Sequence, residues 1–265
     1  MLVAVTGAQG LVGRAVVAEL AHAGHQVRPI DITPGAVRAD ARDHHRLSEA
    51  LAGADALAHL AGLPAPFAAE PHTVHNTNVV ASYNALTAAV DHGITKICLA
   101  SSINALGGAF SRQAHYDYFP VDETHPTYNE DPYSLSKWIA EAQADSIARR
   151  HPHLTIASLR LHGVHPDRHT AITRQPEKQW VINHLWGYVR GDAVGRACLA
   201  ALHADWTGHE IINIVAPDTI DNTPTHDLIS RHYPDVPLRT DLPGNSGLYD
   251  TTKARDLLGW THPRD

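Results

Sequence analysis

Short apolar runs alternate with segments of helical periodicity through the first 160 residues. The apolar runs are short enough for strands, and they cover Leu2–Val5, Val27–Ile32, Ala56–Ala61, Lys96–Ala100 and Thr155–Leu159. The periodic segments between them are predicted helices, and they cover Leu11–Ala23, Leu47–Ala52, Val74–His92 and Tyr133–Arg150. Strands that are apolar on both faces and joined through helices are typical of a parallel sheet with helices on both sides. The pattern therefore predicts an α/β fold built on a doubly wound parallel sheet.

The pattern becomes weaker after residue 160. The remaining predicted elements are a helix over Asp192–His203, a strand over Glu210–Val215 and a helix over Thr225–His232. His165–Gln179 holds prolines and charges with little periodicity, which is typical of a mobile segment on the substrate side. Gly107–Asp131 is polar and aromatic, so we predict a long loop there. We expect a single domain over residues 1–265, in which 1–160 form the main core and parts of 160–265 form a small substrate lobe.

The composition is that of an ordinary globular protein, with 43% hydrophobic and 18% charged residues. A net charge of −7 gives no basis for binding nucleic acid or an anionic membrane, and we expect neither as a partner. Cys98 and Cys198 stand in apolar stretches, which fits a reducing compartment and excludes a disulfide framework. No basic leader precedes the first strand, and no apolar run approaches the ~20 residues that span a bilayer. We therefore expect a cytoplasmic protein.

A glycine-rich turn joins the first predicted strand to the first helix, in Thr6-Gly7-Ala8-Gln9-Gly10-Leu11-Val12-Gly13. Glycines permit unusual φ angles and let the backbone approach a pyrophosphate, while the start of the helix offers free N–H groups. This placement predicts a dinucleotide cradle of the Rossmann type rather than a plain turn. Asp31 ends the second strand, where a carboxylate accepts hydrogen bonds from a ribose and repels a 2′-phosphate. We therefore predict NAD as the cofactor, while Arg28 and Arg38 leave NADP as an alternative.

Tyr133 and Lys137 are four residues apart on a predicted helix, so they share one face of it. A lysine ammonium in that position can lower the pKa of the phenol and give a base that takes a hydroxyl proton near neutral pH. The alternative is an ordinary surface pair near a helix start, which Pro132 marks. Ser101 and Ser102 end the fourth strand, where active-site groups gather in doubly wound sheets, although capping and turn serines also occur there.

These features together resemble the extended short-chain dehydrogenases/reductases, which include the NAD-dependent epimerase/dehydratase family. The resemblance rests on the glycine turn, the acidic end of the second strand, His59–Gly62, Asn78, the serine pair, Tyr133 with Lys137, and Leu159-Arg160. It runs from residue 1 to about residue 215, and Thr252–Ala254 with Leu258–Trp260 resembles the tail of that group. In length and layout the chain is similar to uronate dehydrogenases.

The resemblance implies roles for individual positions. Ser102 would orient the substrate, Tyr133 would act as acid or base, and Lys137 would hold the nicotinamide ribose and tune the phenol. The residues expected to contact the cofactor are Gly7, Gln9, Gly10, Leu11, Val12, Asp31, Asp40, Leu60, Ala61, Gly62, Asn78, Tyr133, Lys137 and His162. Relatives dimerise through the helices that match Val74–His92 and Tyr133–Arg150, so a homodimer is expected.

Departures from the family pattern narrow the reaction. Dehydratases of the group carry an Asp-Glu pair after the residue at the strand end, but Ile103-Asn104 stands here and argues against dehydration. Gly163 stands where epimerases usually have an asparagine, which weakens a nucleotide-sugar interpretation, as does the small C-terminal lobe. Uronate dehydrogenases need a cation for the substrate carboxylate. Val181–Leu185 holds none, and Arg174 and Lys178 are the nearest candidates.

We therefore favour an NAD-dependent oxidoreductase that moves a hydride at a hydroxyl or carbonyl carbon of a small sugar-like or polyol substrate. The first alternative is an NAD-dependent sugar or nucleotide-sugar epimerase, which would give no net NADH. The second is an NAD(P)-binding sensor without catalysis, although such relatives generally lose the Tyr–Lys pair that this chain keeps.

The 21 histidines raise the question of a metal site. His162, His165 and His169 follow the fifth strand, but they have no HExxH motif, nearby cysteine or carboxylate partner at ligand spacing. We therefore predict no metal. His162 is the histidine of interest, because its segment is expected to approach the nicotinamide.

Overall fold

The sheet at the centre of the molecule is parallel throughout. Within residues 1–173 and 178–263, which the computed structural model describes, seven strands follow the order β3-β2-β1-β4-β5-β6-β9. Their bounds are Val37–Arg38 (β3), Gln26–Asp31 (β2), Leu2–Thr6 (β1), Ala56–His59 (β4), Lys96–Ser102 (β5), Thr155–Leu161 (β6) and Gly208–Ile214 (β9). The carboxyl ends of all these strands therefore lie at the same edge, and the order of connection reverses between β1 and β4. Ligands of such sheets bind outside the strand ends at this reversal.

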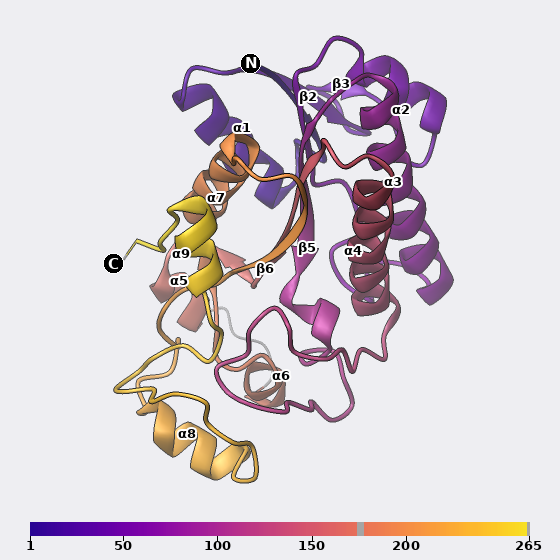
Figure 1. Ribbon diagram of the computed structural model, residues 1–265. Helices are drawn as coiled ribbons and strands as arrows, with labels where there is room; N and C mark the ends of the chain where they lie inside the picture. The colour runs from indigo at the N-terminus through magenta and orange to yellow at the C-terminus, as the bar shows by residue number, and fades with distance from the viewer. Residues whose placement is uncertain (174–177, 264–265) are drawn as a thin grey trace.

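Two layers of helices cover the sheet, one on each face (Figure 1). One layer holds α1 (Leu11–His22), α7 (Gly191–His203) and α9 (Thr252–Leu258), and the other holds α2 (His44–Leu51), α3 (Pro71–Asp91) and α4 (Pro132–Arg150). Successive strand side chains point to opposite faces, so Val3 and Val5 pack with the first layer and Ala4 with the second. This explains why the strands are apolar without alternation, and the predicted doubly wound α/β fold is confirmed.

The predicted elements of the core lie within a few residues of those observed. The fourth predicted strand continues to Ser102, so both candidate serines are strand residues, and a short 3₁₀ turn over Ile103–Leu106 follows. The helix carrying Tyr133 begins at Pro132, because the Asp131 side chain accepts hydrogen bonds from the first free backbone N–H groups. Among the described residues, no helix is both long enough and apolar enough to cross a membrane.

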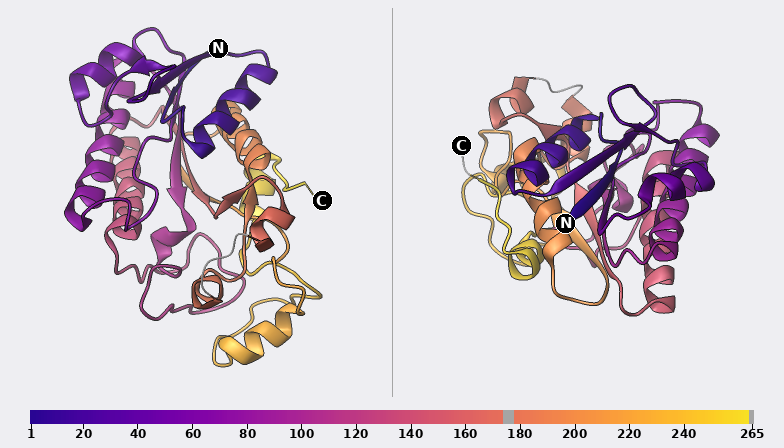
Figure 2. Two further views of the ribbon diagram at one scale, coloured as in Figure 1. Left: turned by 180° about the vertical axis from the view of Figure 1, so that it is seen from behind. Right: turned by 90° about the horizontal axis from the view of Figure 1, so that it is seen from above.

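A smaller lobe lies beyond the carboxyl edge of the sheet (Figure 2). Its regular elements are β7 (Val164–His165), α5 (Arg168–Thr173), α6 (Lys178–Asn183), β8 (Val189–Arg190) and α8 (Thr225–His232). The predicted long loop over Gly107–Asp131 is irregular, yet it gives Tyr116, Phe119 and Val121 to the apolar core of this lobe. The loop is thus packed into the molecule and does not hang free above the sheet.

No regular element was predicted over His165–Gln179, but the described part of that segment contains short ones. β7 ends in it, α5 lies within it and α6 begins in it, while residues 174–177 lie outside the described residues. Helices of six residues are too short to show a helical period, and they form because tertiary packing holds them. Ala171 of α5, for example, is 1% exposed in the core of the lobe.

Candidate active site

The glycine turn between β1 and α1 is closed against its neighbours. Gly7 has φ +67°, and a Cβ there would lie 2.7 Å from the backbone nitrogen of Ala61. A Cβ on Gly13 would lie 2.1 Å from the carbonyl oxygen of Gly7, so only glycine fits. Gly10 precedes α1 without a side-chain cap, which leaves the first N–H groups of the helix available to a ligand. The local geometry therefore fits a pyrophosphate at the helix start.

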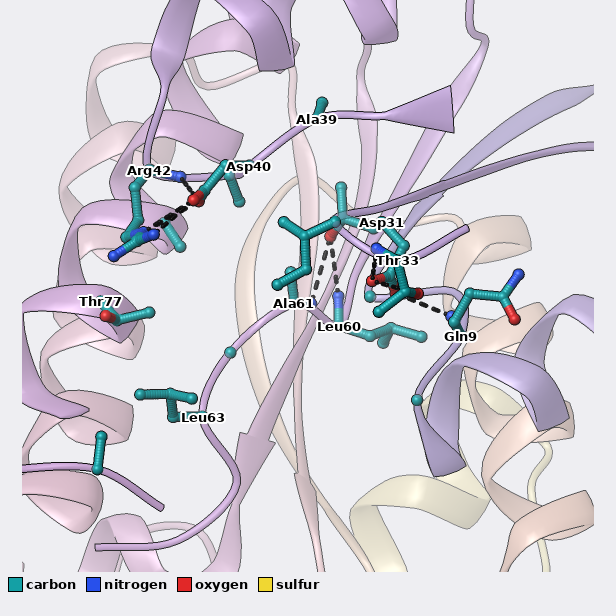
Figure 3. Close-up of a pocket in the computed structure, with 18 of the residues that line it drawn as sticks. Gln9, Asp31, Thr33, Ala39, Asp40, Arg42, Leu60, Ala61, Leu63 and Thr77 are labelled. Carbon is teal, nitrogen blue, oxygen red and sulfur yellow. Dashed lines mark hydrogen bonds and ion pairs between the residues drawn. The ribbon is translucent and has the colours of Figure 1, made fainter. Parts of the chain in front are cut away.

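A cavity of about 670 Å³ opens beside this turn (Figure 3). The predicted cofactor residues that line it are Gly7, Gln9, Gly10, Asp31, Asp40, Leu60, Ala61 and Gly62. Asp31 accepts hydrogen bonds from the backbone N–H groups of Gln9 (2.9 Å) and Thr33 (3.1 Å). Partial burial pushes the pKa of this carboxyl upward, but the hydrogen bonds from Gln9, Thr33 and Ile32 together hold it below its ordinary value. Asp31 is therefore ionised at neutral pH, as a ribose acceptor should be.

Arg42 is a cavity residue that the sequence analysis missed. Its guanidinium forms an ion pair with Asp40 (2.6 Å) on the wall opposite Gln9 (Figure 3). The hydrogen bonds from Arg42 lower the pKa of Asp40. The Asp40 carboxylate, which was expected to contact the cofactor, is therefore already paired within the protein, and the two side chains form one edge of the cavity. The sequence signal that could have revealed this ion pair is the pair of opposite charges two positions apart, directly after β3.

A second cavity of about 550 Å³ adjoins the first, because Gly7, Gly10, Leu60, Gly62 and Leu63 line both. It brings together all of the remaining predicted catalytic and cofactor residues except Asn78, namely Leu11, Val12, Ser102, Tyr133, Lys137 and His162. The two cavities run along the carboxyl edge of the sheet from the end of β2 to the end of β6.

The candidate catalytic side chains converge in this second cavity. Tyr133 and Ser102 both line this cavity, and the Ser102 side chain is near enough to the phenol to lower its pKa. The Lys137 ammonium lies 5.7 Å from the centre of the Tyr133 ring and donates to the carbonyl oxygen of Ala100 (2.7 Å). The helical spacing thus places the two side chains on one face of α4, against the end of β5.

The acid–base state of this pair differs from the simplest expectation. Burial raises the pKa of Tyr133 to about 12, and the neighbouring Ser102 side chain opposes this rise only in part. Burial also lowers the pKa of Lys137 to about 8, against the opposing influence of the Glu141 charge. The expectation of a phenol whose pKa is lowered toward neutrality is therefore wrong for the structure as it stands, because desolvation of the phenolate dominates.

A buried ion pair between α4 and β6 lies next to the candidate catalytic residues, and it was not predicted from the sequence. Glu141 lies one turn beyond Lys137 on α4 and accepts hydrogen bonds from Arg160 Nε and Nη2, both at 2.8 Å. Ser101 Oγ donates to the same carboxylate (2.6 Å), so the first serine of the pair serves this network and the second faces Tyr133. The i, i+4 spacing from Lys137 could have drawn attention to Glu141, but it does not identify Arg160 as its partner.

Asn78 is the one predicted cofactor residue that lines neither cavity. Its side chain donates to the carbonyl oxygen of Leu63 (3.1 Å) and to Ser136 Oγ (3.0 Å), and it accepts from the N–H of Leu63 (2.8 Å). Asn78 therefore ties the loop after β4 to α4, behind the cavity wall.

The lobe side of the second cavity contains polar and aromatic residues that the sequence analysis did not single out. They are Asn104, Phe110, Trp180 and His184. Of the two cations considered for a substrate carboxylate, Arg174 lies outside the described residues, and the side chain of Lys178 is also not described. Elsewhere in the described chain, no group of three or more His, Cys, Asp or Glu side chains could hold a metal ion.

The parallel sheet, the glycine turn and the paired cavities define a dinucleotide-binding α/β protein. A profile of the NAD-dependent epimerase/dehydratase family matches residues 3–171, and the chain belongs to that family. This confirms the family resemblance, the NAD cofactor and, at the level of the family, an enzyme of this class.

The chain is also similar to individual proteins of known activity or structure. It is 33% identical over 169 residues to L-arabinose 1-dehydrogenase (NAD(P)(+)) of Haloferax volcanii, a match that covers 60% of this chain and 65% of that protein. The chain thus spans slightly less than two thirds of this curated relative. The whole chain superposes on a mutated uronate dehydrogenase with TM-score 0.71 at 22% identity, covering 82% of it. It also superposes on UDP-glucose 4-epimerase of Thermotoga maritima with UDP-glucose, with TM-score 0.73 at 21% identity and 94% coverage. These likenesses in structure show the fold.

Proposed function

We propose that the chain is an NAD-dependent dehydrogenase that moves a hydride at a hydroxyl or carbonyl carbon of a small free sugar or polyol. The observation that carries the proposal is the convergence of Ser102, Tyr133 and Lys137 in a cavity that adjoins the glycine turn. The Haloferax volcanii relative, named as an L-arabinose dehydrogenase, supports a free sugar as the substrate class. A cavity of about 550 Å³ is of a size that suits a small ligand.

The residues present fit NAD. Gly7 and Gly13 keep the two closest backbone approaches of the turn free of a Cβ. The start of α1 would offer its N–H groups to the pyrophosphate, and Asp31 would accept from the adenosine ribose. The adenosine half would be flanked by Gln9, Asp40 and Ala61, and by Leu60 and Gly62, which line both cavities. Leu11, Val12, Lys137 and His162 would flank the nicotinamide half. When bound, NAD supplies the acceptor or donor of the hydride.

The side chains of this protein supply the proton transfer. Ser102 would hold the substrate oxygen, and Tyr133 would exchange a proton with it. A pKa of about 12 keeps the Tyr133 phenol protonated at neutral pH, so the site is ready to donate a proton to a carbonyl oxygen. For oxidation, a hydroxyl proton passes to the phenolate, and Lys137 with its positive charge favours that form of Tyr133.

The test is a spectrophotometric assay of NADH formation with the purified protein, NAD⁺ and a panel of neutral sugars and polyols. We expect net NADH with at least one neutral sugar, and a loss of about 10²–10⁴-fold in kcat for Tyr133→Phe with NAD binding retained. Tyr128→Phe is the matched control, because Tyr128 is 43% exposed and lines neither cavity. A fully active Tyr133→Phe variant would refute the proposal, and NAD binding without turnover of any panel member would favour a sensor.

An epimerase is the second candidate, and membership of the NAD-dependent epimerase/dehydratase family favours it. In that reaction the cofactor is returned to its starting state within each turnover. Product analysis by NMR after incubation with sugars and UDP-sugars separates the two proposals, because an epimerase inverts a carbon without net NADH.

We also propose a cytoplasmic homodimer formed through α3 and α4, which lie side by side on one face of the sheet (Figure 1). Four large apolar side chains on these helices are 36–51% exposed, and they are Val80, Tyr83, Leu135 and Trp138. Such a surface supports association between copies of the chain. The buried free thiols of Cys98 and Cys198 support a reducing compartment.

A further inference from the structure

Two residues of the second cavity carry buried polar atoms that lack a partner among the described residues. They are Asn104, through Oδ1, and His184, through Nδ1. Each side chain belongs to a residue that is 4% exposed, and both residues line the cavity that holds Ser102 and Tyr133. A buried polar atom without a partner is costly, so such atoms in a cavity wall indicate where a ligand completes the hydrogen bonding.

The hydrogen bonds already made determine what this pair offers. Asn104 Nδ2 lies 3.4 Å from Ser102 Oγ and 3.4 Å from His184 Nε2. If the amide donates to His184 Nε2, neutral His184 carries its proton on Nδ1, and the pair offers Asn104 Oδ1 as acceptor and Nδ1–H as donor. If the amide is turned over, Asn104 offers N–H groups and His184 offers the Nδ1 lone pair. In both orientations the pair presents one donor and one acceptor, which is what a hydroxyl group requires.

The surroundings fix His184 in place and leave it uncharged. His162 donates from Nε2 to the carbonyl oxygen of His184 (3.0 Å), while its Nδ1 accepts from the N–H of Gly163 (2.7 Å). The rings of His162 and Trp180 lie 4.1 Å and 4.3 Å from that of His184, centre to centre. Burial lowers the pKa of His184 well below its ordinary value, and the neighbouring His162 acts in the same direction.

The backbone after His184 supports a defined position for this side chain. Leu185 and Trp186 have φ +55° and +52°, a conformation that residues other than glycine rarely adopt. Both side chains are buried, and Tyr116 donates a hydrogen bond from its hydroxyl to the carbonyl oxygen of Asn183 (2.7 Å). Strained backbone that the surrounding packing enforces is frequent at ligand sites.

The charge of the cavity selects among hydroxylated ligands. Among the lining residues that the structure describes, Lys137 is the only lysine or arginine, and its ammonium is bound to the Ala100 carbonyl at the reacting end. Phe110 and Trp180 add aromatic surface instead of cations. A sugar acid or a diphosphate would therefore bring a negative charge into a cavity whose described lining holds no second cation to receive it.

We propose that Asn104 and His184 form a hydroxyl-binding subsite, which selects an uncharged sugar with a free hydroxyl beside the reacting carbon over sugar acids and deoxy sugars. This proposal rests on the proposed dehydrogenase function and names the feature by which that site recognises its substrate. His162 acts as a positioning residue, because it holds the carbonyl of His184 and has no nitrogen left for a ligand.

The test measures the activity of the wild type and of several variants on a matched set of sugars. kcat/KM is measured for D-galactose and D-glucose, for the deoxy analogue of each that lacks the hydroxyl beside the anomeric carbon, and for D-galacturonate and D-glucuronate. His184→Phe keeps a ring between His162 and Trp180 but removes both nitrogens. His184→Asn restores a polar group near Nδ1, and His169→Phe is the matched control, because His169 is exposed and lines neither cavity.

We expect the wild type and His169→Phe to prefer the parent sugar over its deoxy analogue by at least about tenfold. His184→Phe should reduce this ratio to between about one and three, and His184→Asn should restore part of it. NAD binding, measured by fluorescence titration, should be unchanged in each variant. If His184→Phe does not bind NAD, the ratio in Asn104→Ala decides, since a general loss of catalysis affects both sugars equally.

Two results overturn the subsite while leaving the dehydrogenase proposal intact. One is turnover of sugars with the same parent-to-deoxy ratio in the wild type and in His184→Phe. The other is a clear preference of the wild type for the uronates. The absence of turnover for every sugar, with NAD bound, would instead remove the proposed function and the subsite with it.

Discussion

Replacing Glu141 by glutamine removes one charge from the buried ion pair beneath the candidate site and leaves its shape unchanged. The carboxylate is 3% exposed, and its partner Arg160 is 4% exposed, with both Arg160 contacts at 2.8 Å and Ser101 at 2.6 Å. Glu141→Gln would leave the buried Arg160 guanidinium without its negatively charged partner. Breaking a buried pair in this way costs about 3–5 kcal/mol in the free energy of unfolding.

This cost can be expressed as a shift in melting temperature. At roughly 2.1 cal/mol/K per residue, the unfolding entropy of a chain of this length is about 0.56 kcal/mol/K, so Tm should fall by about 5–9 °C. The measurement is thermal unfolding by circular dichroism and calorimetry. The matched control is Glu210→Gln, since Glu210 pairs with Lys253 at 2.7 Å with 36% and 31% of the side chains exposed, and an exposed pair contributes about 1 kcal/mol or less.

Glu141→Gln should also change the pH dependence of the reaction. The negative charge of Glu141 raises the pKa of Lys137, which burial has lowered to about 8. Removing that charge lowers the pKa of Lys137 further, so the protonated lysine is lost at lower pH. The alkaline limb of kcat/KM should therefore shift to lower pH, while Glu210→Gln leaves it in place. A Glu141→Gln variant as stable as Glu210→Gln, with an unshifted limb, would refute the reasoning.

Three further predictions follow from the cofactor cleft and the surface. Gly13→Ala places a Cβ 2.1 Å from the Gly7 carbonyl oxygen, so NAD affinity by fluorescence titration should fall at least about tenfold, and unchanged affinity would contradict the cradle. Because Asp31 would repel a 2′-phosphate, the KM for NAD should be lower than the KM for NADP, and Asp31→Ser should narrow the difference between them. A wild-type preference for NADP would contradict the assignment of NAD as the cofactor. Trp138→Glu should convert a dimer into a monomer in sedimentation experiments with NAD binding intact, and a monomeric wild type would remove the proposed interface.

The parts of the fold and site that the sequence predicted depend on neighbours in the chain. The strands were recognised because they are buried on both faces, and Val3 and Ala4 indeed pack against opposite helical layers. The glycine turn occupies a single loop, and Tyr133 and Lys137 are one helical turn apart, so spacing alone places each group. These features are local, and a sequence pattern records them directly.

The parts that the sequence did not predict depend on contacts between distant segments. Asn104 meets His184 across 80 positions of the chain, and His184 directly follows α6, a helix of only six residues that is too short to show a period. Glu141 and Arg160 come from α4 and β6, and no spacing rule pairs a helix residue with a particular strand residue. Asp40 and Arg42 were within reach of a local rule, because they are two positions apart, but nothing in the sequence says that they face the cleft.

Tyr133 and Lys137 lie on one face of the helix, as the sequence predicts, yet the pKa of Tyr133 is raised and not lowered. Helical spacing predicts that the two groups share a face, but it does not predict how deeply that face is buried. Tyr133 is 8% exposed, and burial raises its pKa to about 12, whereas the lysine is held by the Ala100 carbonyl and not by the phenol. The phenol consequently keeps its proton at neutral pH and is set to donate it, which favours reduction. Oxidation needs the phenolate and should become faster as the pH rises, until Lys137 loses its own proton.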